Sequence, residues 1–134
     1  MTEKVTIRRL ATGVPGLDNL LGGGLPEFSF NLIAGTPGSG KTTLAHQIMF
    51  SLARPDNRAL FFTVLGEPAI KMLRYQQQFA FFDISKINNA IRFVNLSEDL
   101  LNGNFDRVLE RIAQEVKDYA PSLVFVDSFR SVVQ

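Results

Sequence analysis

The chain has 134 residues, with 14 lysine and arginine residues against 13 aspartate and glutamate residues, and it contains no cysteine. The missing cysteine excludes disulfide bonds, a cysteine nucleophile and cysteine-ligated metal centres. A net charge of +1 and 46% hydrophobic residues predict one globular domain without strong electrostatic attraction to nucleic acid. No apolar stretch approaches the ~20 residues of a membrane helix. The charged start, Met1–Val5, is unlike a signal peptide, so we expect a cytoplasmic protein.

Apolar runs and helical stripes alternate along the chain. In chain order, the pattern predicts a strand at Phe28–Ala34, a helix at Lys41–Ala53, a strand at Ala59–Leu65 and a helix at Ala69–Phe82. A strand at Ile91–Leu96, a helix between a cap at Asn104 and a stop at Pro121, and a buried strand at Leu123–Val126 follow. This alternation is typical of an α/β fold with a mainly parallel sheet, whose ligands bind beyond the carboxyl ends of the strands.

A glycine-rich turn joins the first predicted strand to the first predicted helix. Its sequence, Gly35-Thr36-Pro37-Gly38-Ser39-Gly40-Lys41-Thr42, matches the phosphate-loop pattern G-x-x-x-x-G-K-[ST] in full. Glycines let backbone N–H groups wrap a polyphosphate, and the following helix directs its positive end at the phosphates. We expect Lys41 to contact the β- and γ-phosphates and Thr42 to offer its hydroxyl to Mg²⁺, with Thr43 beside them in the nucleotide site.

A magnesium–nucleotide site needs a second acidic group, and Asp127 is the candidate. It ends the last apolar strand, where a charge without a partner would be costly. This is the Walker B arrangement, in which an aspartate holds Mg²⁺ through water. The alternative is an aspartate that caps the turn. The next residue, Ser128, is expected to cap the turn rather than to face the metal.

Hydrolysis also needs a group that orients or deprotonates water. Glu67 lies just past the carboxyl end of the second predicted strand and is the best-placed carboxylate for that task. The alternative is that Glu67 caps the helix that starts near Pro68, because acidic residues favour helix starts.

With these motifs, nearly the whole chain resembles the KaiC-like branch of the RecA-type ATPases. The upstream segment narrows the family, since Thr12-Gly13-Val14-Pro15-Gly16-Leu17-Asp18 and Gly22-Gly23-Gly24-Leu25-Pro26 precede the phosphate loop as they do there. The resemblance implies a RecA-like P-loop NTPase fold, with residues 35–42 as Walker A and residues 123–127 as Walker B. It also implies ATP rather than GTP, and a homo-oligomeric ring of subunits, commonly six, with ATP between neighbours.

Two departures from the family bear on activity. Many members carry two adjacent glutamates after the second strand, where this chain has Gly66-Glu67, so turnover would be slow or rest on Glu67 alone. A domain of this type usually continues beyond Walker B, with a further strand that lies between the phosphate-loop strand and the Walker B strand. We therefore expect residues 1–134 to be the N-terminal portion of one such domain, and to be inactive or weakly active alone.

Three functions are compatible with these features. The leading hypothesis is an ATPase that binds ATP and Mg²⁺ and couples hydrolysis to conformational change or ring assembly. The alternative is a nucleotide-sensing scaffold with little turnover that acts on signalling partner proteins. A DNA recombination or repair ATPase is less favoured, because the charge of +1 and the lack of a Lys/Arg tract argue against nucleic acid as a partner.

The single histidine, His46, excludes a multi-histidine metal site. Its position in the predicted helix Lys41–Ala53 favours a partly exposed surface residue. The 12 phenylalanines are expected to fill the core.

Overall fold

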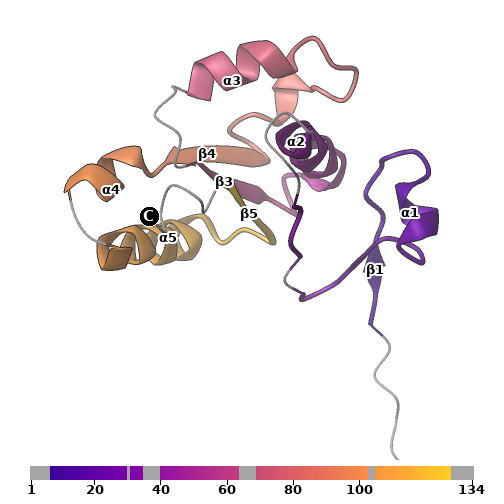
Figure 1. Ribbon diagram of the computed structural model, residues 1–134, viewed down its shortest axis with the longest axis horizontal. Helices are drawn as coiled ribbons and strands as arrows, with labels where there is room; N and C mark the ends of the chain where they lie inside the picture. Colours follow the sequence, from indigo (N-terminus) through magenta and orange to yellow (C-terminus); the bar gives the residue numbers. More distant parts are fainter. Residues whose placement is uncertain (1–6, 30, 35–39, 64–68, 103–104, 128–134) are drawn as a thin grey trace, which may run out of the picture. The chain divides into compact units, whose positions relative to one another are not determined.

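The computed structural model describes residues 7–29, 31–34, 40–63, 69–102 and 105–127. The chain divides into two compact units, Met1–Leu52 and Ala53–Gln134 (Figure 1).

The first unit consists of short elements followed by one long helix. Its elements are β1 (Arg9–Leu10), α1 (Leu17–Leu20), β2 (Leu25–Pro26) and α2 (Lys41–Leu52). The two strands pair antiparallel, with Leu10 opposite Leu25. Gly24, at the entry to β2, has φ 135°, and a Cβ at this position would collide with the carbonyl oxygen of Leu10. Only glycine allows the two backbones to approach this closely, which accounts for a glycine directly before Leu25.

The helix predicted at Lys41–Ala53 is confirmed as α2, which ends one residue earlier. The prediction that His46 is partly exposed is wrong, because its exposed fraction is 0%. His46, Met49 and Phe50 stand at positions i, i+3 and i+4, so they share one face of the helix, and all three are buried. In the sequence, the positions of Met49 and Phe50, three and four residues after His46, already indicated that the histidine lies on the buried face.

The strand predicted at Phe28–Ala34 is wrong for the part of this segment that the structure describes. No strand forms there, and the side chains are exposed, by 99% at Phe28 and 79% at Leu32. Phe28 has φ 58°, a left-handed conformation incompatible with a strand. A strand needs a hydrogen-bonded neighbour, and among residues 28–29 and 31–34 no such pairing is found.

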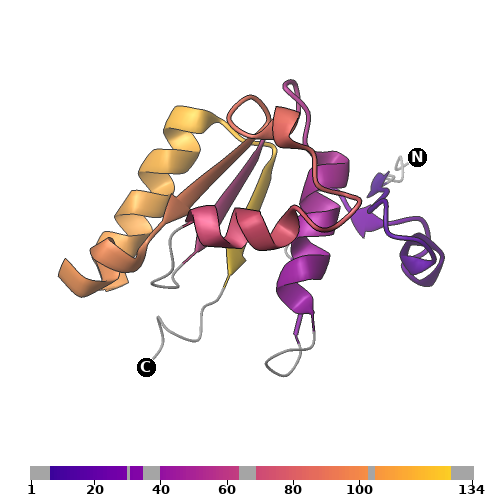
Figure 2. The same cartoon turned by 90° about the horizontal axis from the view of Figure 1, so that it is seen from above.

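The second unit contains a parallel three-stranded sheet with helices packed on it. Its elements are β3 (Ala59–Thr63), α3 (Ala69–Gln76), a 3₁₀ turn η1 (Ile84–Lys86), β4 (Ile91–Asn95), α4 (Ser97–Asn102), α5 (Phe105–Tyr119) and β5 (Leu123–Asp127). The strand order is β4-β3-β5 (Figure 2). All five residues of β3, the central strand of the three, are buried, as is typical of a strand whose side chains are covered on both faces of the sheet. The predicted buried strand at the chain's end is confirmed as β5, but its burial is only partial, since Val124 is 47% exposed.

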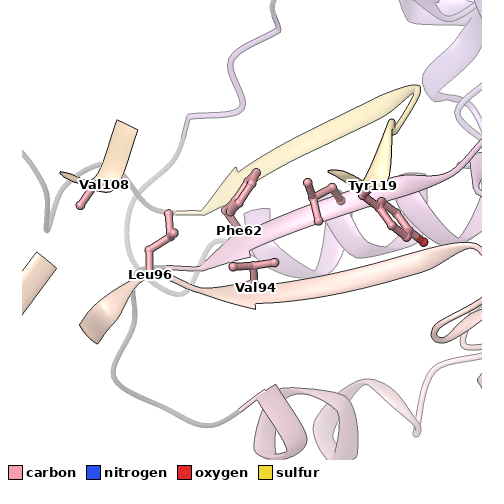
Figure 3. Packing of buried hydrophobic residues seen from close by; sticks show 6 residues of the cluster. Phe62, Val94, Leu96, Val108 and Tyr119 are labelled. Carbon is pink, nitrogen blue, oxygen red and sulfur yellow. The ribbon is translucent and has the colours of Figure 1, made fainter. Parts of the chain in front are cut away.

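The two faces of the sheet carry different side chains. On one face Leu60, Phe62, Val94 and Leu96 pack with two residues of α5, Val108 and Tyr119 (Figure 3). On the other, three phenylalanines in register form a row across the strands: the ring centroid of Phe61 lies 5.5 Å from that of Phe93 and 6.1 Å from that of Phe125. The helix α3 lies on the side of the sheet opposite α5 (Figure 1). The prediction that phenylalanines fill the core thus holds for Phe61 and Phe62, which are fully buried, but not for Phe28 and Phe105, which are 99% and 44% exposed.

The two helices that differ most from the prediction are α3 and α4. The helix predicted at Ala69–Phe82 ends at Gln76. Beyond it, the rings of Phe79 and Phe81 stack with centroids 5.4 Å apart, which a helix forbids because residues two positions apart do not face each other. The helix α4 was not predicted, although Glu98 and Asp99 in its first turn were a signal for a helix start. The predicted cap Asn104 lies outside the described residues, while the helix that follows it is confirmed as α5.

Candidate functional site

The first half of the predicted site is the start of α2. Gly40, the last glycine of the phosphate-loop pattern, has φ 89°, and apart from its chain neighbours no atom of the described residues lies within 4 Å of the position that a Cβ would take. The amide of Leu44 donates a hydrogen bond to the Gly40 carbonyl oxygen, at 2.9 Å. The helix therefore begins directly after Gly40, and Lys41, Thr42 and Thr43 form its first turn.

This first turn is suited to an anion. Backbone N–H groups at a helix start have no intrahelical partner and carry a partial positive charge. The first turn of α2 holds no acidic residue that would offset this charge, and it holds the cation of Lys41 instead. Together with the positive φ of Gly40, these features fit a phosphate group, which such a turn binds through its amides.

The second half of the predicted site is the carboxyl edge of the sheet. There Thr63, the last residue of β3, is in register with Asn95 of β4 and with Asp127 of β5. Three polar side chains thus end three neighbouring parallel strands. Asn95 uses its Oδ1 to accept a hydrogen bond from the amide of Ser97 at 2.9 Å, which starts α4. Thr63, only 3% exposed, lies between Asn95 and Asp127 in the sheet.

Thr63 is the residue at this edge that sequence reasoning missed. The predicted strand ran from Ala59 to Leu65, which placed Thr63 inside the strand. In the structure Thr63 is the last described residue of β3, and residues 64 and 65 lie outside the described residues. The sequence signal for Thr63 was a polar side chain that follows an apolar run, which is the same signal that identified Asp127. Aligning the ends of the predicted strands would have placed the two residues side by side.

The donor set at Asp127 fits magnesium bound with a nucleotide. Among the described residues, no three histidine, aspartate or glutamate side chains gather into a group that could hold a metal ion by themselves. Mg²⁺ usually keeps several waters and takes one or two carboxylates together with substrate phosphates, rather than a cage made only of protein. A single strand-end carboxylate such as Asp127 meets that requirement.

Gly35, Thr36, Pro37, Gly38, Ser39, Glu67 and Ser128 lie outside the described residues. Their roles stay predictions.

A family model described as the KaiC ATPase matches residues 10–134. The chain belongs to the KaiC ATPase family. The match starts at Leu10, so it includes both glycine-containing segments upstream of the phosphate loop.

Known KaiC-family proteins and relatives align with most of this chain. It is 29% identical over 140 residues to the circadian clock oscillator protein KaiC of Prochlorococcus marinus, a match that covers 98% of this chain and 27% of that protein. It is 31% identical over 126 residues to the DNA repair protein RadA of Bacillus subtilis, covering 94% of this chain and 24% of RadA. The chain therefore spans about a quarter of the length of these curated relatives.

A solved structure supports the fold. The KaiC-like protein PH0186 from Pyrococcus horikoshii superposes with a TM-score of 0.79 at 31% identity, over 95% of this chain and 58% of that one. The predicted α/β, RecA-like fold of the KaiC family is thus confirmed. Within the residues that the structure describes, no helix has the length and apolar character needed to cross a membrane.

Proposed function

We propose that this KaiC-family chain binds ATP with Mg²⁺ and hydrolyses it, as the N-terminal portion, residues 1–134, of one ATPase domain. The observation that supports the proposal is the complete phosphate-loop sequence Gly35–Thr42, whose last two residues, Lys41 and Thr42, begin α2. The family model, which describes an ATPase, supports it.

Each side chain has a distinct role in this proposal. Backbone N–H groups of the phosphate loop, in which Pro37 has none to offer, wrap the phosphates, and Lys41 neutralises charge on the β- and γ-phosphates. Thr42 would offer its hydroxyl oxygen to Mg²⁺ and Asp127 would hold the ion through water; the bound ion would offset negative charge on the phosphates. Glu67 orients or deprotonates the attacking water. Hydrolysis is coupled to conformational change or to assembly of a homo-oligomeric ring.

Substitution of Lys41 tests the proposal. In the full-length protein, Lys41→Ala should weaken ATP binding by about 10- to 100-fold, because it removes one charge-assisted contact of about 1.5–3 kcal/mol. The measurement is titration of a fluorescent ATP analogue. Lys117→Ala, an exposed lysine in the last turn of α5, is the matched control and should bind as the wild type does. Equal affinity of Lys41→Ala and wild type would overturn the assignment of the site.

A second candidate is a nucleotide sensor that scarcely hydrolyses ATP and acts through signalling partners. The single glutamate of Gly66-Glu67 favours it, because many family members have two glutamates there. Phosphate release by the full-length protein separates the two functions, since the sensor would bind ATP without sustained release.

A role in DNA repair has support from the 31% identity to RadA. The net charge of +1 argues against it, because nucleic-acid binding relies on clustered Lys and Arg. Salt-dependent DNA binding by the full-length protein would favour this function.

A further inference from the structure

The Thr12–Asp18 loop, between β1 and α1, is closed by the Asp18 carboxylate. Asp18 Oδ1 accepts hydrogen bonds from the Thr12 amide at 2.8 Å and from the Thr12 hydroxyl at 2.7 Å. The same hydroxyl oxygen accepts from the Val14 amide at 3.2 Å. Thr12 is completely buried. One side chain at each end of the loop therefore fixes its shape.

Backbone hydrogen bonds tie this loop to the elements around it. The Leu17 amide donates to the Val14 carbonyl oxygen at 3.1 Å, and the Gly23 amide donates to the Asp18 carbonyl oxygen at 2.7 Å. Asp18 thus joins the loop before it to the glycine turn after α1. The β1–β2 pair then holds the two ends of this segment together.

The closed loop touches the last turn of α2. A Cβ at Gly13 would collide with the hydroxyl oxygen of Ser51 and lie 2.6 Å from the Ser51 Cβ. Gly13 also has φ 74°. Gly16, in the same loop, has a similar φ of 81°, but within the described part of the chain nothing beyond its own neighbours lies within 4 Å of its Cβ position. Both positions need glycine for their backbone conformation, and only Gly13 needs it for contact with α2.

We propose that the Thr12–Asp18 loop positions the phosphate-binding turn by fixing the opposite end of α2. Ser51 lies about 15 Å along the helix axis from Lys41, at 1.5 Å per residue. An α-helix of this length moves as one body, so a shift at Ser51 displaces Lys41 and Thr42 at its start. Displacements of about 1 Å at a reacting group can change rates by about 10²-fold. Thr12, Gly13 and Asp18 are the positioning residues, and the inference rests on the proposed function.

Paired substitutions at Gly13 and Gly16 test the contact. In the full-length protein, Gly13→Ala should weaken binding of ATP with Mg²⁺ by about tenfold. Gly16→Ala carries the same left-handed backbone strain without a collision, so its affinity should stay within about twofold of wild type. The double variant Gly13→Ala/Ser51→Gly removes the colliding side chain and should recover the affinity of Ser51→Gly alone. Binding is measured by calorimetry at a temperature where circular dichroism shows every variant folded.

Thr12 provides a second test that does not involve backbone strain. Thr12→Val keeps the shape of the side chain but loses the hydroxyl that bonds Asp18 and Val14, so it should weaken ATP binding by several-fold. Thr12→Ser retains the hydroxyl and should bind as wild type does. A purely structural role would lower the unfolding temperature of these variants and leave the affinity of the folded protein unchanged.

The outcomes separate this inference from the function on which it rests. Wild-type affinity in both Gly13→Ala and Thr12→Val would overturn the inference, and so would a loss in Gly13→Ala that Ser51→Gly does not reverse. Equal ATP binding by wild type and Lys41→Ala would instead overturn the proposed nucleotide site, whatever the loop variants show.

Discussion

Thr63 and Asp127 are register partners at the last residues of two adjacent parallel strands, β3 and β5. Because β3 is buried along its whole length, the position of Asp127 is set by a rigid neighbour rather than by a surface loop. Rigid strands hold site residues more precisely than loops do. The pairing therefore provides a fixed base for the carboxylate proposed to hold Mg²⁺.

Substitution Asp127→Asn should reduce the magnesium dependence of ATP binding. The amide has the same shape but no charge, so it is a weaker Mg²⁺ ligand. We expect the gain in affinity that Mg²⁺ gives the wild type to fall by about tenfold, or about 1.4 kcal/mol. Calorimetry with Mg²⁺ and with EDTA measures this gain. Asp56→Asn, at an exposed position in the turn before β3, is the control. An undiminished effect of Mg²⁺ in Asp127→Asn would rule out Asp127 as a ligand.

Substitution Glu67→Gln should separate binding from turnover. The amide cannot act as a base, and loss of a general base typically costs about 10²–10⁴-fold in rate. We expect phosphate release by the full-length protein to fall by that amount while ATP affinity is retained. Glu98→Gln, an exposed residue in the first turn of α4, should leave both unchanged. If Glu67→Gln turns over ATP at the wild-type rate, another group activates the water.

Two arginine side chains pack over the Tyr119 ring. The ring and the hydroxyl of this residue should differ in their effect on stability. The guanidinium carbons of Arg58 and Arg92 lie 4.7 and 4.6 Å from the ring centroid. The buried hydroxyl has no hydrogen-bond partner among the described residues. Tyr119→Phe removes this unsatisfied group and should raise the free energy of unfolding by about 1 kcal/mol or leave it unchanged.

Tyr119→Leu, which removes the aromatic ring as well as the hydroxyl, is the comparison for Tyr119→Phe. Tyr119→Leu loses both cation–π contacts, at about 0.5–1 kcal/mol each, together with some packing, so we expect a loss of about 2 kcal/mol. Urea unfolding of the three proteins measures these differences. If Tyr119→Phe proves as destabilising as Tyr119→Leu, the hydroxyl and not the ring is the stabilising group.

The hydrogen bonds between Thr12 and the Asp18 carboxylate should contribute to stability in a defined pH range. Hydrogen bonds from the Thr12 backbone amide, and then from the Thr12 hydroxyl, hold the pKa of Asp18 below its ordinary value. A carboxylate with a lowered folded-state pKa stabilises the protein above its unfolded-state pKa, near 3.9, and this stability is lost as the pH falls through the folded-state pKa.

Acid unfolding measures this contribution. Below about pH 4, the free energy of unfolding of Asp18→Asn should fall less steeply with decreasing pH than that of wild type. The difference in slope should correspond to at most one fewer proton taken up on unfolding. Thr12→Val should give a similar change, because it removes one of the donors that lower the pKa. If the free energy of unfolding of Asp18→Asn falls with decreasing pH in the same way as that of wild type, the Asp18 carboxylate does not contribute to stability.

The features that the sequence by itself determined are local. The spacing of apolar residues predicted α2 and α5, and a continuous apolar run predicted β3. The eight-residue pattern at Gly35–Thr42 predicted the phosphate loop. These could be predicted because helix periodicity and the conformational demands of glycine act within a few residues. The family followed from the same short motifs.

The tertiary structure decided what depends on distant neighbours. The predicted strand Phe28–Ala34 is not formed in its described residues, and the helix predicted to run to Phe82 ends at Gln76. Only the sheet order β4-β3-β5 set Thr63 beside Asp127, and only folding brought Gly13 against Ser51. Strand pairing and side-chain packing join residues far apart in the chain, so no local pattern of residues specifies them.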